Sequence, residues 1–394
     1  MHRPARILAL AIPILVVLSP GIAALAGLMT APGVLHPMNL NPERLEQTEQ
    51  MLERTGARKQ DFDVRAFDGV ELRGWKIRPR APNGDWVLLF HGVSDNRSGV
   101  LGQAEFLLRH GYSVVMMDSR AHGKSGGEMA TYGWKERYDT VAVTNGLYAT
   151  EHVAHLFALG VSMGGVVALQ SAAVEPRIEA VVAEDPFANL REVSYDYAGL
   201  DVSPLLGKTL FRPAVLVAMH AIEKEGGFDP DPDNVSPEKD VAERAFPVLL
   251  ICGTEDHRIP CRHAERIYAA ATGSKQLWVV RGAGHATALG YAPPEYERRV
   301  IDFFANVSAN RAQTGPVSGP TAAGQKRAGW KPALHKLRAG GGVVAGAEIP
   351  EEDGEGQEHG CDHGHKSRVV GRNRAAQHAH TGIKRGESEG NDPA

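Results

Sequence analysis

Cysteine is scarce in this sequence, and an excess of positive charge is absent. The 394 residues include three cysteines, Cys252, Cys261 and Cys361, which form no C-x-x-C pair. An odd count without such a pair suggests neither a disulfide framework nor a thiolate metal site. The formal net charge is −4, which argues against nucleic acid as a partner. With 43% hydrophobic residues, the chain can still bury a sizeable core.

Charge is missing altogether from a stretch near the N-terminus. Arg3 and Arg6 precede an uncharged run over residues 7–29, and residues 24–26, Ala-Leu-Ala, form a small-x-small sequence of the kind that signal peptidase cuts. About 20 apolar residues also suffice to span a bilayer. We therefore expect residues 1–30 to be an export signal, either cleaved or kept as a membrane anchor. A buried core helix is the less favoured alternative. The rest of the chain would then be periplasmic, secreted or anchored facing outward.

The C-terminal part lacks the pattern of a folded domain. From residue 310 the chain is rich in Gly, Ala, His and charge and has almost no aromatic residues. This composition predicts a disordered tail over residues 310–394. Cys361, His363 and His365 lie close together in it, but their spacing matches no zinc site, so no metal is predicted there.

Residues 61–309 alternate short apolar runs with helix-length segments, and residues 31–60 are expected to be a linker and lead-in. Buried strands are predicted over residues 86–90, 113–117, 155–159, 178–183, 248–252 and 277–280. Such alternation indicates an α/β fold with a mostly parallel sheet flanked by helices. Residues 63–67 and 70–77 flank Asp68-Gly69, a hairpin signal that predicts an antiparallel opening to the sheet. Residues 186–245 interrupt the alternation and are predicted to form a cap inserted after the sixth strand.

A serine between glycines follows one predicted strand. Gly160-Val161-Ser162-Met163-Gly164 joins the strand at residues 155–159 to a helix-like segment at 166–174, the context in which a G-x-S-x-G motif is informative. The turn must be so sharp that the serine hydroxyl is exposed while strand and helix pass closely, and glycine removes the Cβ atoms that would clash. Ser162 is the candidate nucleophile. An ordinary serine in a glycine-rich turn is the alternative.

A serine hydroxyl needs a base, and the base needs a carboxylate that fixes its tautomer. Asp256 follows the strand at residues 248–252, and His285 follows the strand at 277–280. The carboxyl ends of parallel strands meet at one edge of a sheet, where ligands bind. His285 is therefore the candidate base and Asp256 the acid that orients it.

Other residues could take these roles. Glu255 is adjacent to Asp256, and Asp185 ends the preceding strand, so either could supply the carboxylate. We favour Asp256 because the G-x-x-D-x-x-x-P spacing places it at the outer bend of its loop. His257 could be mistaken for the base and is expected to be a surface or loop-bonding histidine.

Acyl chemistry also requires N–H donors where negative charge develops. One candidate is the backbone N–H of Met163, after the nucleophile and at the positive end of a helix. The second is the backbone N–H of Val93, in the loop after the strand at residues 86–90. Gly92 allows this loop to approach the substrate, and His91 is expected to support it.

The motifs together resemble the α/β-hydrolase superfamily. They are residues 90–93, 118–125, 160–164 and 253–256 and the pair Gly284-His285. Within that superfamily the chain resembles bacterial exported or membrane-tethered esterase and peptidase-like hydrolases related to prolyl-oligopeptidase-type domains. The resemblance implies an α/β-hydrolase fold and a Ser-His-Asp acyl hydrolase without metal or organic cofactor. It also implies a structural role for Asp118, Arg120 and His122.

The expected substrate is a small or lipid-like acyl compound, and a carboxylic ester is favoured. A peptidase or an acyltransferase would use the same triad, and a catalytically silent, membrane-tethered binding module is the alternative outside the enzymes. Within the predicted cap, residues 214–222 are apolar almost all round. This stretch either packs within the cap or lines an acyl pocket.

Overall fold

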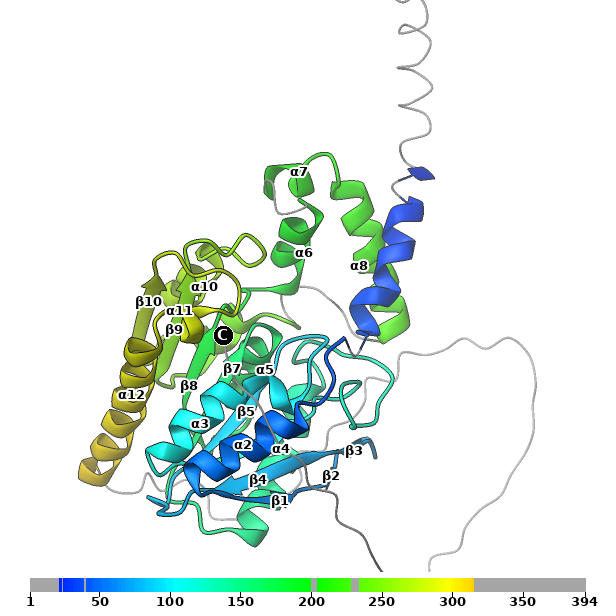
Figure 1. The fold of residues 1–394 in the computed structure, drawn as a ribbon. Coiled ribbons are helices and arrows are strands. Elements are labelled where there is room, and N and C mark those ends of the chain that lie inside the picture. Colours follow the sequence, from blue (N-terminus) through cyan, green and yellow to red (C-terminus); the bar gives the residue numbers. More distant parts are fainter. Residues whose placement is uncertain (1–20, 23, 39, 200–203, 228–233, 315–394) are drawn as a thin grey trace, which may run out of the picture. The chain divides into compact units, whose positions relative to one another are not determined.

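The computed structural model describes residues 21–22, 24–38, 40–199, 204–227 and 234–314, and an eight-stranded sheet lies at its centre (Figure 1). The strands are β1 (Arg58–Asp61), β4 (Gly74–Arg78), β5 (Trp86–Phe90), β6 (Ser113–Met117), β7 (Leu156–Val161), β8 (Ile178–Glu184), β9 (Val248–Gly253) and β10 (Lys275–Val280). Their order is β1-β4-β6-β5-β7-β8-β9-β10. Strand β4 is antiparallel to both neighbours, and every other pairing is parallel. The predicted α/β fold and all six predicted strands are confirmed, but β10 is an edge strand and is only partly buried, contrary to the prediction of a buried strand.

Helices cover both faces of the sheet. One face is packed by α2 (Leu45–Thr55), α3 (Leu101–Arg109) and α12 (Pro293–Thr314), and the other by α4 (Glu136–Thr150), α5 (Met163–Val174), α9 (Pro237–Glu243) and α10 (Arg262–Ala270). Alternate residues of a strand point to opposite faces. Accordingly, Val87 and Leu89 of β5 join the first core, whereas Trp86 and Leu88 join the second. Parallel strands buried on both sides explain the continuous apolar runs in the sequence.

The antiparallel opening of the sheet differs from the prediction. The hairpin at Asp68-Gly69 forms a separate two-stranded sheet from β2 (Val64–Arg65) and β3 (Glu71–Leu72), and β1 pairs with β4 instead. The chain leaves the hairpin at Arg73, whose N–H donates to Ser125 Oγ. Gly74 then passes so close to β6 that a Cβ atom would lie 2.2 Å from Met117 Sδ.

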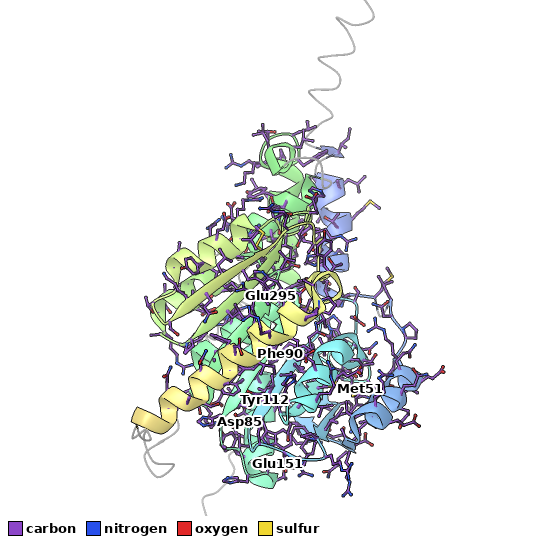
Figure 2. All side chains as sticks on the ribbon, turned by 60° about the vertical axis from the view of Figure 1, so that its left-hand side comes forward. Met51, Asp85, Phe90, Tyr112, Glu151 and Glu295 are labelled. Atoms are coloured by element: carbon purple, nitrogen blue, oxygen red, sulfur yellow. A yellow bond between two sulfur atoms is a disulfide. The ribbon has the colours of Figure 1, made fainter. Side chains whose placement is uncertain are left out.

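The lead-in also contributes to the core, contrary to the linker expected over residues 31–60. Helix α2 packs against α3, and Met51, 1% exposed, lies in the first core (Figure 2). Strand β1 forms the edge of the main sheet. The folded domain therefore begins before residue 61.

A cap follows β8, the sixth strand of the main sheet in chain order, as expected. It contains α6 (Leu190–Ala198), α7 (Pro204–Lys208) and α8 (Arg212–Gly226). Helix α9 packs against α5 and α10, so it covers the sheet and the cap ends before Pro237. Met219 of α8 is buried against α6, and Val217 lies beside Gly27. These contacts favour cap packing over an acyl pocket for residues 214–222.

The predicted chain ends are only partly described. Residues 1–20 of the expected export signal and residues 315–394 of the expected tail lie outside the described residues. Residues 24–35 form a helix, and α12 continues to Thr314, past the expected start of the tail. Among the helices that the structure describes, none has the length and apolar character needed to cross a membrane.

Candidate active site

Ser162 occupies a strained turn between β7 and α5. Its backbone has φ 56° and ψ −122°, which few residues other than glycine adopt. A Cβ at Gly160 would lie 2.1 Å from Gly164 O, and one at Gly164 would lie 2.2 Å from Phe90 O. Both glycines are therefore needed for the crossing of strand and helix.

The structure brings the three predicted side chains into one hydrogen-bonded chain. His285 Nε2 lies 2.9 Å from Ser162 Oγ, and His285 Nδ1 lies 2.7 Å from Asp256 Oδ2. Asp256 is 3% exposed. Burial lowers the pKa of His285, but the hydrogen bond to Asp256 and the charges of Asp256 and Asp185 outweigh burial and hold that pKa above its usual 6.5.

The hydrogen bonds of Asp256 define the tautomer of the histidine. The N–H groups of Arg258 and Ile259 both donate to Asp256 Oδ1, each at 2.9 Å. Oδ2 is left to accept the Nδ1 proton of His285. The lone pair of neutral His285 then lies on Nε2, toward the Ser162 hydroxyl, as a general base requires.

The loop after β5 lies beside Ser162. A Cβ built on Gly92 would lie 3.7 Å from Ser162 Cβ, so the bare α-carbon faces the nucleophile. Buried His91 supports the loop: its Nε2 accepts the Ser119 N–H at 3.0 Å, and its Nδ1 donates to Gly92 O at 2.8 Å. Burial lowers the pKa of His91 to about 3, so the ring is neutral. This arrangement agrees with the expected supporting role.

The lead-in segment braces the same loop from the other side. Leu40 N–H donates to Ser94 O at 3.2 Å, and Asn96 Nδ2 donates to Asn41 O at 2.9 Å. Ser94 has φ 60°, so the loop is held in an uncommon conformation. The loop after β5 is therefore held by contacts with residues distant from it in the sequence.

Asp185 lies beside the triad but outside the Ser162–His285–Asp256 chain. It accepts the Ala286 N–H at 2.7 Å and the Gly253 N–H at 3.2 Å, which joins the histidine loop to β9. Burial, Glu184 and Asp256 raise the pKa of Asp185 to about 8. Sequence reasoning treated Asp185 only as a rival acid, and the signal for its supporting role was its position at the end of a central strand.

Glu184 supports the histidine loop in the same way. Its carboxylate accepts the Ala288 N–H at 3.0 Å and the Tyr296 hydroxyl at 2.9 Å. By contrast, the remaining rivals lie at the surface, where Glu255 and His257 have side chains 62% and 67% exposed and lie 3.8 Å apart. His257 thus has the expected surface position.

The acid loop is closed by a disulfide that the cysteine count did not predict. Cys252 and Cys261 are bonded, with Cα atoms 5.4 Å apart, and Asp256 lies between them. Cys252 lies near the end of β9, and the chain turns back so that Cys261 caps the start of α10. A separation of nine residues carries no signal of this return, so the absence of a disulfide was wrongly inferred.

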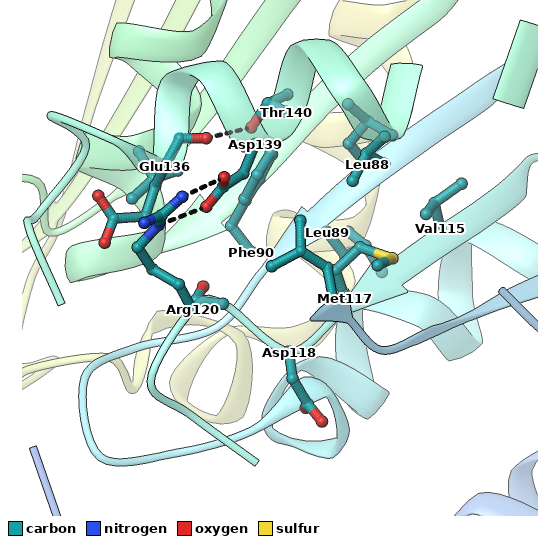
Figure 3. Close-up of a pocket in the computed structure, with 14 residues that line it drawn as sticks. Leu88, Leu89, Phe90, Val115, Met117, Asp118, Arg120, Glu136, Asp139 and Thr140 are labelled. Carbon is teal, nitrogen blue, oxygen red and sulfur yellow. Dashed lines mark hydrogen bonds and ion pairs between the residues drawn. The ribbon is translucent and has the colours of Figure 1, made fainter. Parts of the chain in front are cut away.

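The Asp118 region is structural. Asp118 accepts the N–H groups of Arg97 and Lys124, and Arg120 forms a buried ion pair with Asp139 (Figure 3). The cavity beside this ion pair has a volume of about 30 Å³. It has room for water but not for an acyl substrate, since ligand pockets span roughly 300–1,000 Å³.

Three side chains at the site could in principle share a metal ion. Ligand atoms of Asp185, Asp256 and His285 lie within 4.8 Å of one another. Both nitrogens of His285 are engaged with Asp256 and Ser162, and both oxygens of Asp185 accept backbone N–H groups. These atoms are therefore already occupied by hydrogen bonds within the protein.

Comparison with known proteins agrees with this geometry. A family model described as serine aminopeptidase, S33, matches residues 81–221. An uncharacterised Mycobacterium tuberculosis protein is 30% identical over 229 residues, 57% of this chain and 72% of the relative. The Bacillus subtilis protein YqkD is 28% identical over 255 residues, 64% and 80% of the two chains. The chain belongs to the α/β-hydrolase superfamily.

Solved α/β-hydrolases share the fold. A Pyrococcus furiosus esterase is 26% identical with a TM-score of 0.53, covering 65% of this chain and 93% of that one. A Penicillium α/β-hydrolase is 18% identical with a TM-score of 0.50, covering 64% and 99%. The latter comparison bears on the fold alone. Taken with the family match, these relatives support a hydrolytic function for this α/β-hydrolase.

Proposed function

We propose that this α/β-hydrolase is a serine hydrolase that cleaves carboxylic esters through an acyl-enzyme intermediate. The observation that carries the proposal is the chain of hydrogen bonds from Ser162 through His285 to Asp256, at 2.9 and 2.7 Å. Ser162 also lies in a strained turn between closely packed glycines, and such strain is concentrated at functional sites in proteins. No metal or organic cofactor is part of the proposal.

In the first half-reaction Ser162 Oγ attacks the acyl carbonyl while His285 Nε2 takes the hydroxyl proton. Asp256 stabilises the imidazolium that forms. The backbone N–H groups of Met163 and Val93 hold the oxyanion, the former at the N-terminus of α5. His285 then protonates the leaving alcohol.

In the second half-reaction water replaces the alcohol. His285 takes a proton from this water as the water attacks the acyl-enzyme carbonyl. His285 then gives that proton to Ser162 Oγ as the carboxylic acid leaves, which regenerates the free enzyme. Acyl transfer to an alcohol or amine would follow the same path with another acceptor. The enzyme is a hydrolase where water reacts faster with the acyl-enzyme, and an acyltransferase where an alcohol or amine does.

An ester is favoured because the Pyrococcus furiosus protein of similar fold is an esterase. A serine peptidase is the second candidate, favoured by the family model described as serine aminopeptidase. A catalytically silent, membrane-tethered module would have no need of an assembled hydrogen-bonded triad, so it ranks below both. We propose a small or lipid-like acyl compound as the substrate.

We also propose that the protein is exported and is either anchored facing outward or released. Two features support this location. The uncharged run over residues 7–29 follows Arg3 and Arg6. The Cys252–Cys261 disulfide is of a kind that persists in oxidising compartments.

Substitution of the nucleophile tests the proposal. Ser162→Ala should abolish labelling by a fluorophosphonate probe and lower kcat on p-nitrophenyl acetate by about 10⁶-fold. Ser274→Ala, an exposed serine next to β10, is the matched control and should behave as wild type. Residual turnover above a tenth of wild type would reject Ser162 as nucleophile. Comparing esters of graded chain length with aminoacyl amides separates esterase from peptidase.

A further inference from the structure

The helix formed by residues 24–35 packs on the cap through one side. Ala31 and Leu35 are 1% and 0% exposed and join the apolar cluster that contains Met219 of α8. A Cβ at Gly27 would lie 2.5 Å from Ala214 O, so the two backbones touch. This side of the helix is therefore fully covered by protein.

The other side of the same helix is apolar but uncovered. Ile22, Leu25, Leu28 and Met29 are 61%, 61%, 56% and 74% exposed. Residues three, four and seven apart share one face of a helix, and residues 21–35 carry no charge. A helix at a water-facing surface normally presents polar residues on its outer side. This side is thus built for an apolar environment.

The cap also carries exposed apolar side chains. Leu210, before α8, is 67% exposed, and Leu216 of α8 is 45% exposed. The N-terminal helix and α8 lie side by side, and α7 lies near the beginning of α8 at the top of the cap (Figure 1). Arg212 is exposed there, as is Lys208, which also pairs with Glu192. Apolar side chains bordered by cations are typical of surfaces that lie in a membrane interface.

The sequence indicates what covers this surface. Residues 7–20 are uncharged and directly precede the helix in the sequence, so the exposed side chains follow an apolar segment. Residues 315–394 are rich in Gly and charge, so they match an apolar surface less well than residues 7–20 do. An apolar leader and basic flanking residues together match a bilayer with anionic headgroups.

We propose that a docking face made of Ile22, Leu25, Leu28, Met29, Leu210 and Leu216 rests in the interfacial layer of a lipid bilayer. The N-terminal helix and the cap then bind lipid as one surface, with Arg212 and Lys208 toward the headgroups. This goes beyond attachment by the N-terminus, because it places the cap itself at the membrane. It does not rest on the catalytic proposal, since the triad takes no part in it.

The test locates single labels relative to lipid in the full chain. After Cys361→Ser, the remaining cysteines are Cys252 and Cys261, which are bonded to each other. A cysteine added elsewhere is then the single free thiol, and it can be labelled with an NBD fluorophore without a reductant that would break the disulfide. Leu210→Cys probes the docking face, and Gln276→Cys, exposed on edge strand β10, is the matched control. The protein is mixed with phosphatidylglycerol and phosphatidylcholine vesicles whose acyl chains carry bromine.

A docked cap should place the label at position 210 within reach of the bromine. We expect it to shift to shorter wavelength and to be quenched at least fivefold more than the label at position 276. Equal quenching at the two positions would overturn the proposal. The same difference in quenching in a Ser162→Ala protein would show that lipid docking does not depend on catalysis.

Two other occupants of the docking face give distinct results without vesicles. A second copy of the chain would shift the emission at position 210 in proportion to protein concentration. The C-terminal region would shift it independently of concentration, and deletion of residues 315–394 would abolish that shift. Either result would overturn a lipid partner. Matching thermal unfolding of the two labelled proteins guards against misfolding as a cause.

Discussion

Asp256→Asn is a substitution whose result follows from the hydrogen bonds of one carboxylate. Two backbone N–H groups donate to Asp256 Oδ1, so the carbonyl oxygen of asparagine will occupy that position. The amide NH2 then faces His285 Nδ1 in place of Oδ2, at 2.7 Å in the native site. Because the amide is a donor, it stabilises the tautomer with the proton on Nε2. That tautomer cannot accept the proton of Ser162.

The expected loss in kcat is about 10⁴-fold, or roughly 5.5 kcal/mol in the activation barrier. The assay is hydrolysis of p-nitrophenyl acetate across pH, with thermal unfolding as the control for folding. In the wild type, kcat/KM should rise with pH through a midpoint above 6.5, because His285 must lose its proton to act as a base and its pKa is raised. A loss of less than tenfold with an unchanged midpoint would refute this account of the tautomer.

Three further substitutions test the scaffold. Gly160→Ala should lower the midpoint of thermal unfolding by about 5–10 °C, because the new Cβ would lie 2.1 Å from the backbone oxygen of Gly164. Gly290→Ala is the control and should have little effect, because the space around Gly290 is open. Asp185 has a pKa of about 8 in the folded protein, above its value in the unfolded chain, so the free energy of unfolding of the wild type should fall as pH rises from 4 to 8, by up to about 1.4 kcal/mol per pH unit. Asp185→Asn should make this fall less steep. An equally steep fall in the variant would count against a buried proton on Asp185. Replacing Cys252 and Cys261 together by serine should destabilise the domain by about 3 kcal/mol in denaturant unfolding, and unchanged stability would show that the ring around the acid loop is unimportant.

Local pattern was sufficient for the central strands and for the elbow. Apart from Ser113, the runs at residues 86–90 and 113–117 are apolar because both faces of those strands are buried, and they match β5 and β6. The serine motif could be interpreted because its two glycines avoid a clash between strand and helix that involves only residues 160–164 and their immediate neighbours. Strand ends and motif order brought Asp256 and His285 to the same edge of the sheet, where the structure places them with Ser162.

What the sequence could not provide are contacts between distant segments. The bond from Ala286 N–H to Asp185 spans 101 residues, and no spacing rule connects the two. The disulfide likewise depends on the return of the chain from β9 to α10. The hairpin at Asp68-Gly69 was recognised as a turn, but its strands β2 and β3 form a separate sheet, and β4 pairs with β1 and β6 instead. Local signals describe elements, and their partners follow from packing.

The contacts that hold the loop after β5 determine how far the chain can be shortened from its N-terminus. Leu40 and Asn41 contact Ser94 and Asn96 through main-chain and amide groups, and Glu43 pairs with buried Arg97 at 2.6 Å. The smallest fragment that keeps this loop in place must therefore start upstream of Leu40, although no triad residue occurs before Ser162. A chain shortened to begin at Gly27 would keep all these contacts, whereas a cut at residue 43 would release the loop after β5.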